Sequence, residues 1–194
     1  MHLIIPILAE AGSSSKDLWE LGSFKATVAA TLITLGAAVI TGGFAVWQWR
    51  KELRWKQAEL ARTLLDEIFD YGPSNDAWRM VDGEEIYKGD KGNEYHISMD
   101  FVRRALPTPW SDERAGPDVY VRWCFDALLY YLERLEQSVQ IKLVRFEDLS
   151  ASTSYYVDLM AKDKKLFQEY AEHIRFKGAV AFMDRFPAWR NKEA

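Results

Sequence analysis

The residues best suited to metal binding are few and scattered along the chain. After residue 50 the sequence has only two histidines, His96 and His173. Glu169 and His173 lie four residues apart, a spacing that places two side chains on one face of a helix. A zinc site needs three or four ligands, and no further His or Cys accompanies this pair. We therefore interpret Glu169 and His173 as a surface ion pair and predict no metal site.

Residues that could support nucleophilic or acid–base catalysis also lack partners. Cys124 is the only cysteine, so an internal disulfide is excluded. It lies in an apolar segment without a nearby base and is predicted to be a core residue. The acid pairs Glu84–Glu85 and Glu147–Asp148 suit solvent-facing positions or helix starts better than catalysis. No P-loop, GxGxxG motif or Ser/His/Asp set is present. The sequence predicts no catalytic residue, no cofactor and no enzymatic activity.

Basic and aromatic residues near the C-terminus could recognise a nucleotide or another anion by stacking and charge. They are Arg175, Lys177, Arg185, Trp189 and Arg190. The alternative, which we favour, is a solvated helix face that ends in a packed tryptophan. The formal net charge of −4 argues against nucleic acid as a partner. The sequence does not identify a small-molecule ligand.

The segment from Ala26 to Trp47 contains no charged residue and reads ATVAATLITLGAAVITGGFAVW. As a helix, these residues would extend about 33 Å, enough to cross a hydrocarbon core of about 30 Å. We predict a transmembrane helix over residues 24–49. Residues 1–23 form a short extracytoplasmic N-terminus, and their apolar start is expected to lie in the interface or on a partner, with a cleaved signal as the alternative.

Tryptophan and basic residues gather after this segment, as is typical of a membrane–water interface. The predicted interface anchors are Trp47, Trp49, Arg50, Lys51, Arg54 and Trp55. Residues 1–25 contain only two basic side chains, Lys16 and Lys25. The positive-inside rule therefore predicts a cytoplasmic C-terminal side and an outside N-terminus. The basic residues could also bind anionic membrane lipids, and the alternative is that they only set the orientation.

Small side chains recur every four residues within the predicted span. They are Ala26, Ala30, Thr34, Ala38 and Gly42, and we call them the small-residue row. Such a row lets two helix backbones approach closely, so it predicts association with a second copy or with another membrane protein. Threonine hydroxyls beside it could bond across helices or to carbonyls of their own helix. A pore lined by threonines is a further alternative.

The rest of the chain predicts an all-α fold in which the span continues into a cytoplasmic helical bundle. Residues 50–72 form a membrane-proximal helix with apolar positions at Leu53, Leu60, Leu64 and Ile68. Residues 73–190 form the bundle, and the expected helices cover 74–81, 100–106, 118–139, 146–162 and part of 163–186. Ser74 or Asn75 would cap the first, and Pro187 would end the last. Residues 84–99 form either a β-hairpin, with Ile86 and Tyr87 facing Tyr95 and Ile97, or an ordered loop.

Four pieces of sequence carry a resemblance: WQWRKELRWKQAELARTLLDEI, YVRWCFDALLYYLERLEQ, VRFEDL and VAFMDRF. This pattern of helices and aromatic residues resembles small, uncharacterised bacterial membrane proteins with one span and a helical cytoplasmic domain. Some of them look like membrane effectors of anti-phage abortive infection. The resemblance implies a bacterial inner-membrane protein that self-associates through its span and has a sensing or binding domain. An accessory or structural subunit of a larger membrane complex is the alternative.

Overall fold

A computed structural model describes residues 7–83, 85–88, 94–107 and 116–191 of the 194-residue chain. These residues are mostly helical, with one small two-stranded antiparallel sheet. The chain divides into two compact units, one up to Arg54 and one from Trp55 onward. The expectation of a mostly helical fold with a long apolar N-terminal helix is thus confirmed.

Helix α1 covers Ile7–Asp70 and therefore contributes residues to both units. It ends before Gly72-Pro73, which start the next helix, because proline suits a first helical turn. The predicted helix break at Gly72-Pro73 is confirmed.

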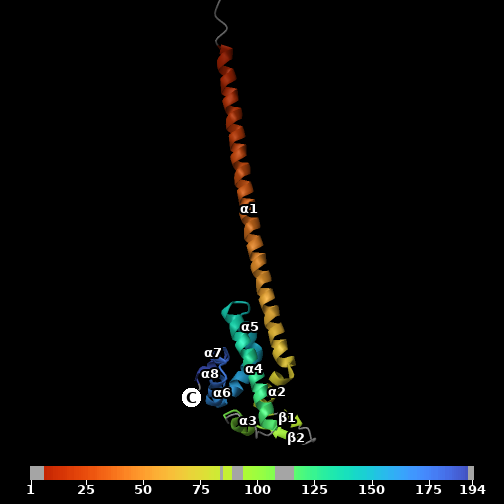
Figure 1. The fold of residues 1–194 in the computed structure, drawn as a ribbon. Helices are drawn as coiled ribbons and strands as arrows, with labels where there is room; N and C mark the ends of the chain where they lie inside the picture. Colours follow the sequence, from red (N-terminus) through yellow and green to blue (C-terminus); the bar gives the residue numbers. More distant parts are fainter. Residues whose placement is uncertain (1–6, 84, 89–93, 108–115, 192–194) are drawn as a thin grey trace, which may run out of the picture. The chain divides into compact units, whose positions relative to one another are not determined.

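Besides the end of α1, the described part of the second unit contains seven further α-helices and one 3₁₀ helix (Figure 1). They are α2 (Gly72–Asp82), α3 (Met99–Ala105), α4 (Gly116–Gln140), α5 (Phe146–Met160), η1 (Ala161–Asp163), α6 (Lys164–His173), α7 (Lys177–Met183) and α8 (Pro187–Asn191).

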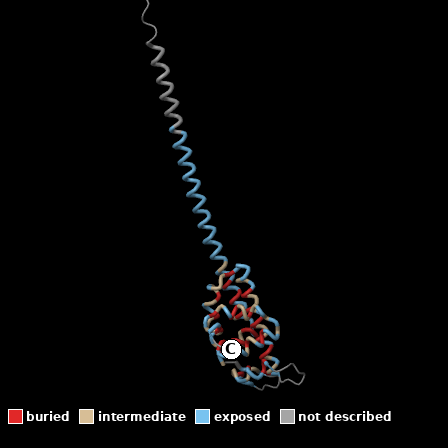
Figure 2. The backbone as a smooth tube through the Cα atoms, turned by 90° about the vertical axis from the view of Figure 1, so that its left-hand side faces the viewer, coloured by how far each residue is buried: buried red, intermediate tan, exposed pale blue. Residues whose placement is uncertain are grey.

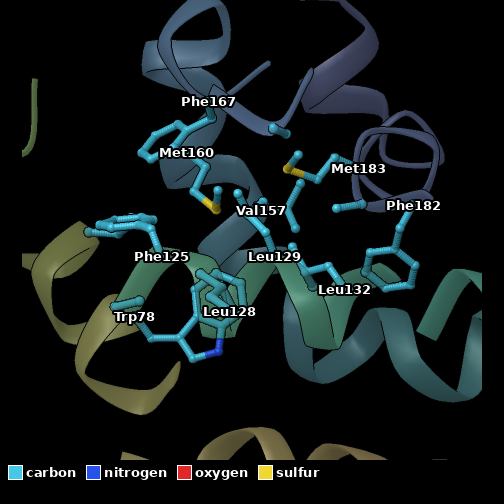
Figure 3. Close-up of a cluster of buried hydrophobic side chains, with 14 of the residues drawn as sticks. Trp78, Phe125, Leu128, Leu129, Leu132, Val157, Met160, Phe167, Phe182 and Met183 are labelled. Carbon is cyan, nitrogen blue, oxygen red and sulfur yellow. The ribbon is translucent and has the colours of Figure 1, made fainter. Parts of the chain in front are cut away.

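Helix α4 is central to the bundle because apolar residues occur around most of its circumference. Its Phe125, Leu128 and Leu132 are fully buried. Figure 3 shows side chains of four other helices meeting them. These are Trp78 of α2, Val157 and Met160 of α5, Phe167 of α6, and Phe182 and Met183 of α7. Cys124 is also fully buried on α4, as predicted for a core residue.

The last turns of α1 belong to the core of the second unit. Ala61, Leu64, Leu65 and Ile68 are buried at the i, i+3, i+4, i+7 spacing of a helix face. Of the four apolar positions that indicated this helix, Leu64 and Ile68 therefore lie in the core. Leu53, at 44%, and Leu60, at 36%, are exposed.

The pairing expected for a hairpin is confirmed for residues 85–88 and 94–97, while the residues that connect them lie outside the described part. Strand β1 (Glu85–Lys88) pairs with β2 (Glu94–Ile97) in antiparallel register. Tyr87 faces Tyr95 as expected, but Ile86 faces His96 and Ile97 faces Glu85. Ile97 is fully buried and so ties the hairpin to the core.

Two predicted helix boundaries are wrong for identifiable reasons. Tyr71 is the cap residue of α2, and the Ser74 hydroxyl donates to the carbonyls of Tyr71 and Ile68 instead of capping. Pro187 starts helix α8 instead of only ending α7, because its fixed φ also suits a first helical turn.

Candidate membrane-spanning segment

Residues 27–56 of α1 are all exposed in the chain by itself (Figure 2). The exposed residues include large apolar side chains: Ile33 is 73%, Val39 is 74% and Ile40 is 75% exposed. The most apolar 18-residue window has a mean hydropathy of 1.9, and none of it is buried. Helix α1 is therefore long and apolar enough to cross a membrane, and the apolar surface of residues 27–49 is not used by the described protein core.

The threonine hydroxyls of this segment bond to their own helix. Thr31 donates to the carbonyl of Thr27 at 2.9 Å, and Thr34 donates to that of Ala30 at 2.8 Å. Thr41 donates to the carbonyl of Ala37 at 2.8 Å. These bonds satisfy each hydroxyl donor without water, as a hydrocarbon environment requires. Of the two bonding patterns expected for the threonines, the structure contains the intrahelical one.

The small-residue row lies along one side of α1. The exposure of the Ala26 side chain is outside the described part. At about 100° per residue, the row from Ala30 to Gly42 drifts by about 120° around the helix axis. A Cβ added at Gly42 would have no atom within 4 Å, so the backbone there is open to a neighbour. Gly36 is equally open and lies about 180° from the middle of the row.

Aromatic and basic side chains stack where the apolar run ends. The Phe44 and Trp47 ring centres are 5.7 Å apart. One turn further, the Lys51 Nζ atom lies 5.6 Å from the centre of the Trp47 ring. This order, from apolar to aromatic to charged, matches the change in polarity across a membrane interface. Trp47 and Lys51 were predicted as anchors, whereas the contact of Phe44 with Trp47 was not predicted, although their i, i+3 spacing could have indicated it.

The other predicted anchors are accessible in the same stretch of α1. Trp49 is 62% and Trp55 is 69% exposed. Arg50 and Arg54 are exposed as well.

In the bundle, buried charged groups hold helices together. The guanidinium of Arg122 donates to the carbonyls of Ala105 and Leu106, at 3.0 and 2.6 Å, and so binds the end of α3 to α4. The hydroxyl of Tyr170 donates to Asp126 at 2.6 Å. Burial raises the pKa of the Asp126 carboxyl, while this hydrogen bond and the Arg122 charge act against the increase.

Glu136 and Arg185 form the most enclosed ion pair of the described bundle. Both guanidinium–carboxylate contacts are 2.7 Å, and the Glu136 side chain is only 3% exposed. The hydrogen bonds to Glu136 raise the pKa of Arg185 above its usual range. Arg185 therefore connects α4 to the end of α7 and is occupied by a structural partner.

Two further candidate residues, Trp189 and Glu169, have structural surroundings. Trp189 is fully buried in the core, as the packed-tryptophan interpretation predicts. Glu169 lies 3.9 Å from Lys165, so the described ion pair of Glu169 is with a lysine. Among the described residues, no three His, Cys, Asp or Glu side chains lie close enough to hold a metal ion.

Comparison with known proteins finds no family model, no curated relative and no solved structure that matches this chain.

Proposed function

We propose that the chain is a single-pass bacterial inner-membrane protein whose span self-associates and whose helical domain acts as a cytoplasmic sensing or binding module. We further propose that it is a membrane effector of anti-phage defence. The observation that supports the membrane assignment best is the wholly exposed apolar surface of residues 27–49. An exposed apolar surface of this extent needs a lipid or protein cover in water.

The orientation is proposed from the charges around the span. Arg50, Lys51 and Arg54 follow it closely, whereas Lys25 is the described basic residue directly before it. The positive-inside rule then puts the bundle in the cytoplasm. The Phe44–Trp47–Lys51 stack supports an interface at this level of the helix.

Self-association is proposed from the small-residue row. Lipid supplies no hydrophobic drive between helices, so close packing at small residues is the main source of association. The intrahelical bond of Thr34 satisfies the hydroxyl donor of the row, and Thr31 and Thr41 beside it are bonded in the same way. Its smooth surface can therefore pack against a second copy.

The role in phage defence rests on the resemblance of the helical pattern to membrane effectors of abortive infection. Such an effector needs two states, and a ligand that binds the bundle better in one of them would shift the population. Assembly of spans would then perturb the membrane.

The matched pair Gly42→Leu and Gly36→Leu tests this function. Both glycines have open surroundings, but only Gly42 belongs to the small-residue row. We expect the Gly42 variant to lose most of the homo-oligomer mass in mild detergent and most of the membrane depolarisation on overproduction. The Gly36 variant should retain both. Equal behaviour of the two variants would refute association through the row, and a stoichiometric foreign partner in place of the homo-oligomer would favour an accessory subunit.

A further inference from the structure

The turn between α4 and α5 has apolar side chains at its exposed tip. Ile141 is 67% and Leu143 is 50% exposed, and they flank the exposed Lys142. The neighbouring Val144 is 2% exposed, so the turn has a buried base and an apolar outer edge. In Figure 1 this turn lies at the opposite end of the bundle from the β1–β2 hairpin.

The backbone of this turn is fixed. Lys142 has a φ of 61°, and the amides of Lys142 and Leu143 donate to the carbonyls of Val139 and Ser138 at 3.1 and 3.0 Å. This is the Schellman pattern at the end of a helix. In this motif the residue after the left-handed one usually packs an apolar side chain against an apolar residue in the last turn of the helix. Here the residue in that last turn is the polar Ser138, opposite Leu143. Leu143 is therefore available to another surface.

A hydrogen bond locates the turn along α1. The Gln57 Nε2 atom donates to the carbonyl of Lys142 at 2.9 Å. Gln57 is only two residues beyond the exposed Trp55, about 3 Å along a helix axis. The turn therefore lies beside the part of α1 that directly follows the exposed Trp55, within the second unit.

We propose that the α4–α5 turn is a second membrane contact, in which Ile141 and Leu143 rest in the headgroup layer of the bilayer that α1 crosses and Lys142 meets anionic lipid. This inference rests on the proposed single-pass topology. Apolar side chains that flank a cation suit such a layer, because the apolar parts enter the acyl boundary while the charge stays with the phosphates.

Nitroxide labels at three single positions of the full-length protein test the proposal in phosphatidylcholine–phosphatidylglycerol bilayers. The variants are Val39→Cys in the span, Ile141→Cys in the turn and Ile86→Cys in the hairpin as an exposed isoleucine control. The native Cys124 is fully buried, so the labelled wild-type chain supplies the background. The measured quantity is the ratio of label collisions with oxygen to collisions with a water-soluble nickel chelate, which rises with depth in a bilayer.

We expect the highest ratio at Val39, a clearly raised ratio at Ile141 and a low, aqueous ratio at Ile86. The further variant Lys142→Glu should lower the Ile141 ratio, and an unchanged value would overturn the role of Lys142. A ratio at Ile141 equal to that at Ile86 would refute the second contact while Val39 still supports the span. A fall in the collision rates of the Ile141 label with both oxygen and the nickel chelate, in detergent as well as in bilayers, would also refute the second contact. Such a result would mean that protein, not lipid, covers the turn. A low ratio at Val39 would refute the membrane topology itself.

Discussion

The Lys51 ammonium lies over the Trp47 ring, with its Nζ atom 5.6 Å from the ring centre. The two residues are one helical turn apart, and the ring centres of Phe44 and Trp47 are 5.7 Å apart. An attraction between a cation and a ring is stronger where water is scarce, as at the edge of a bilayer. The pair therefore marks the expected depth of the interface on α1.

Brominated lipids should distinguish this tryptophan from one in the bundle. The variant Trp47→Phe removes a fluorophore near the acyl chains, so the quenched fraction of the total tryptophan fluorescence should fall. The control Trp123→Phe removes a tryptophan that is 53% exposed on α4, so the quenched fraction should rise. If both substitutions changed the quenched fraction in the same direction, Trp47 would not lie at the interface.

Loss of Arg185 should destabilise the bundle strongly. The variant Arg185→Met leaves the Glu136 carboxylate buried without its cation, and we expect a loss of about 3 kcal/mol in the free energy of unfolding. The double variant with Glu136→Met should lose less, because no buried charge remains. Denaturant titration of the full chain in detergent measures both. The exposed Arg190→Met is the control, and a comparable loss there would contradict this role of the ion pair.

The Asp126 carboxyl should make stability depend on pH. Its pKa is raised above the ordinary value of 3.8, mainly by burial, so the folded state holds this proton more tightly than the unfolded state. Its contribution to stability is therefore greatest at low pH and is lost as the pH rises through the raised pKa. The variant Asp126→Asn keeps an oxygen for the Tyr170 hydroxyl and cannot ionise.

We expect the stability of the Asp126→Asn variant, relative to wild type, to improve from pH 3.5 to pH 7. Unfolding midpoints at a series of pH values check this. A relative stability that is constant, or that improves toward acid, would mean that burial does not control this carboxyl.

Arg175 offers a stabilising substitution. Its φ is 69°, and the amides of Arg175 and Phe176 donate to the carbonyls of Glu172 and Ala171 in a Schellman pattern. Glycine has no Cβ to strain there, so Arg175→Gly should raise the free energy of unfolding by about 1 kcal/mol. Arg175→Ala removes the charge but retains the Cβ, and it should give no such gain. An equal gain in both variants would attribute the effect to charge.

The sequence predicted those elements whose signal is local. The uncharged run of residues 26–47 predicted the apolar helix, and Gly72-Pro73 predicted where α1 ends. Apolar residues around most of the helix over residues 118–139 predicted that α4 would be central. It could not predict long-range pairs such as Glu136 with Arg185 or Gln57 with Lys142, because their partners are set by the packing of helices. Ser74 and Pro187 were misassigned because each residue type fits more than one position near a helix end.

The most direct test of the account is the side of the membrane on which each end of the span lies. A membrane-impermeant maleimide should label Lys25→Cys in intact spheroplasts and label Gln140→Cys only after lysis, while the buried Cys124 of wild type remains unlabelled. Labelling of both positions before lysis, or of neither, would contradict a single crossing. Labelling of Gln140→Cys alone would contradict the proposed orientation.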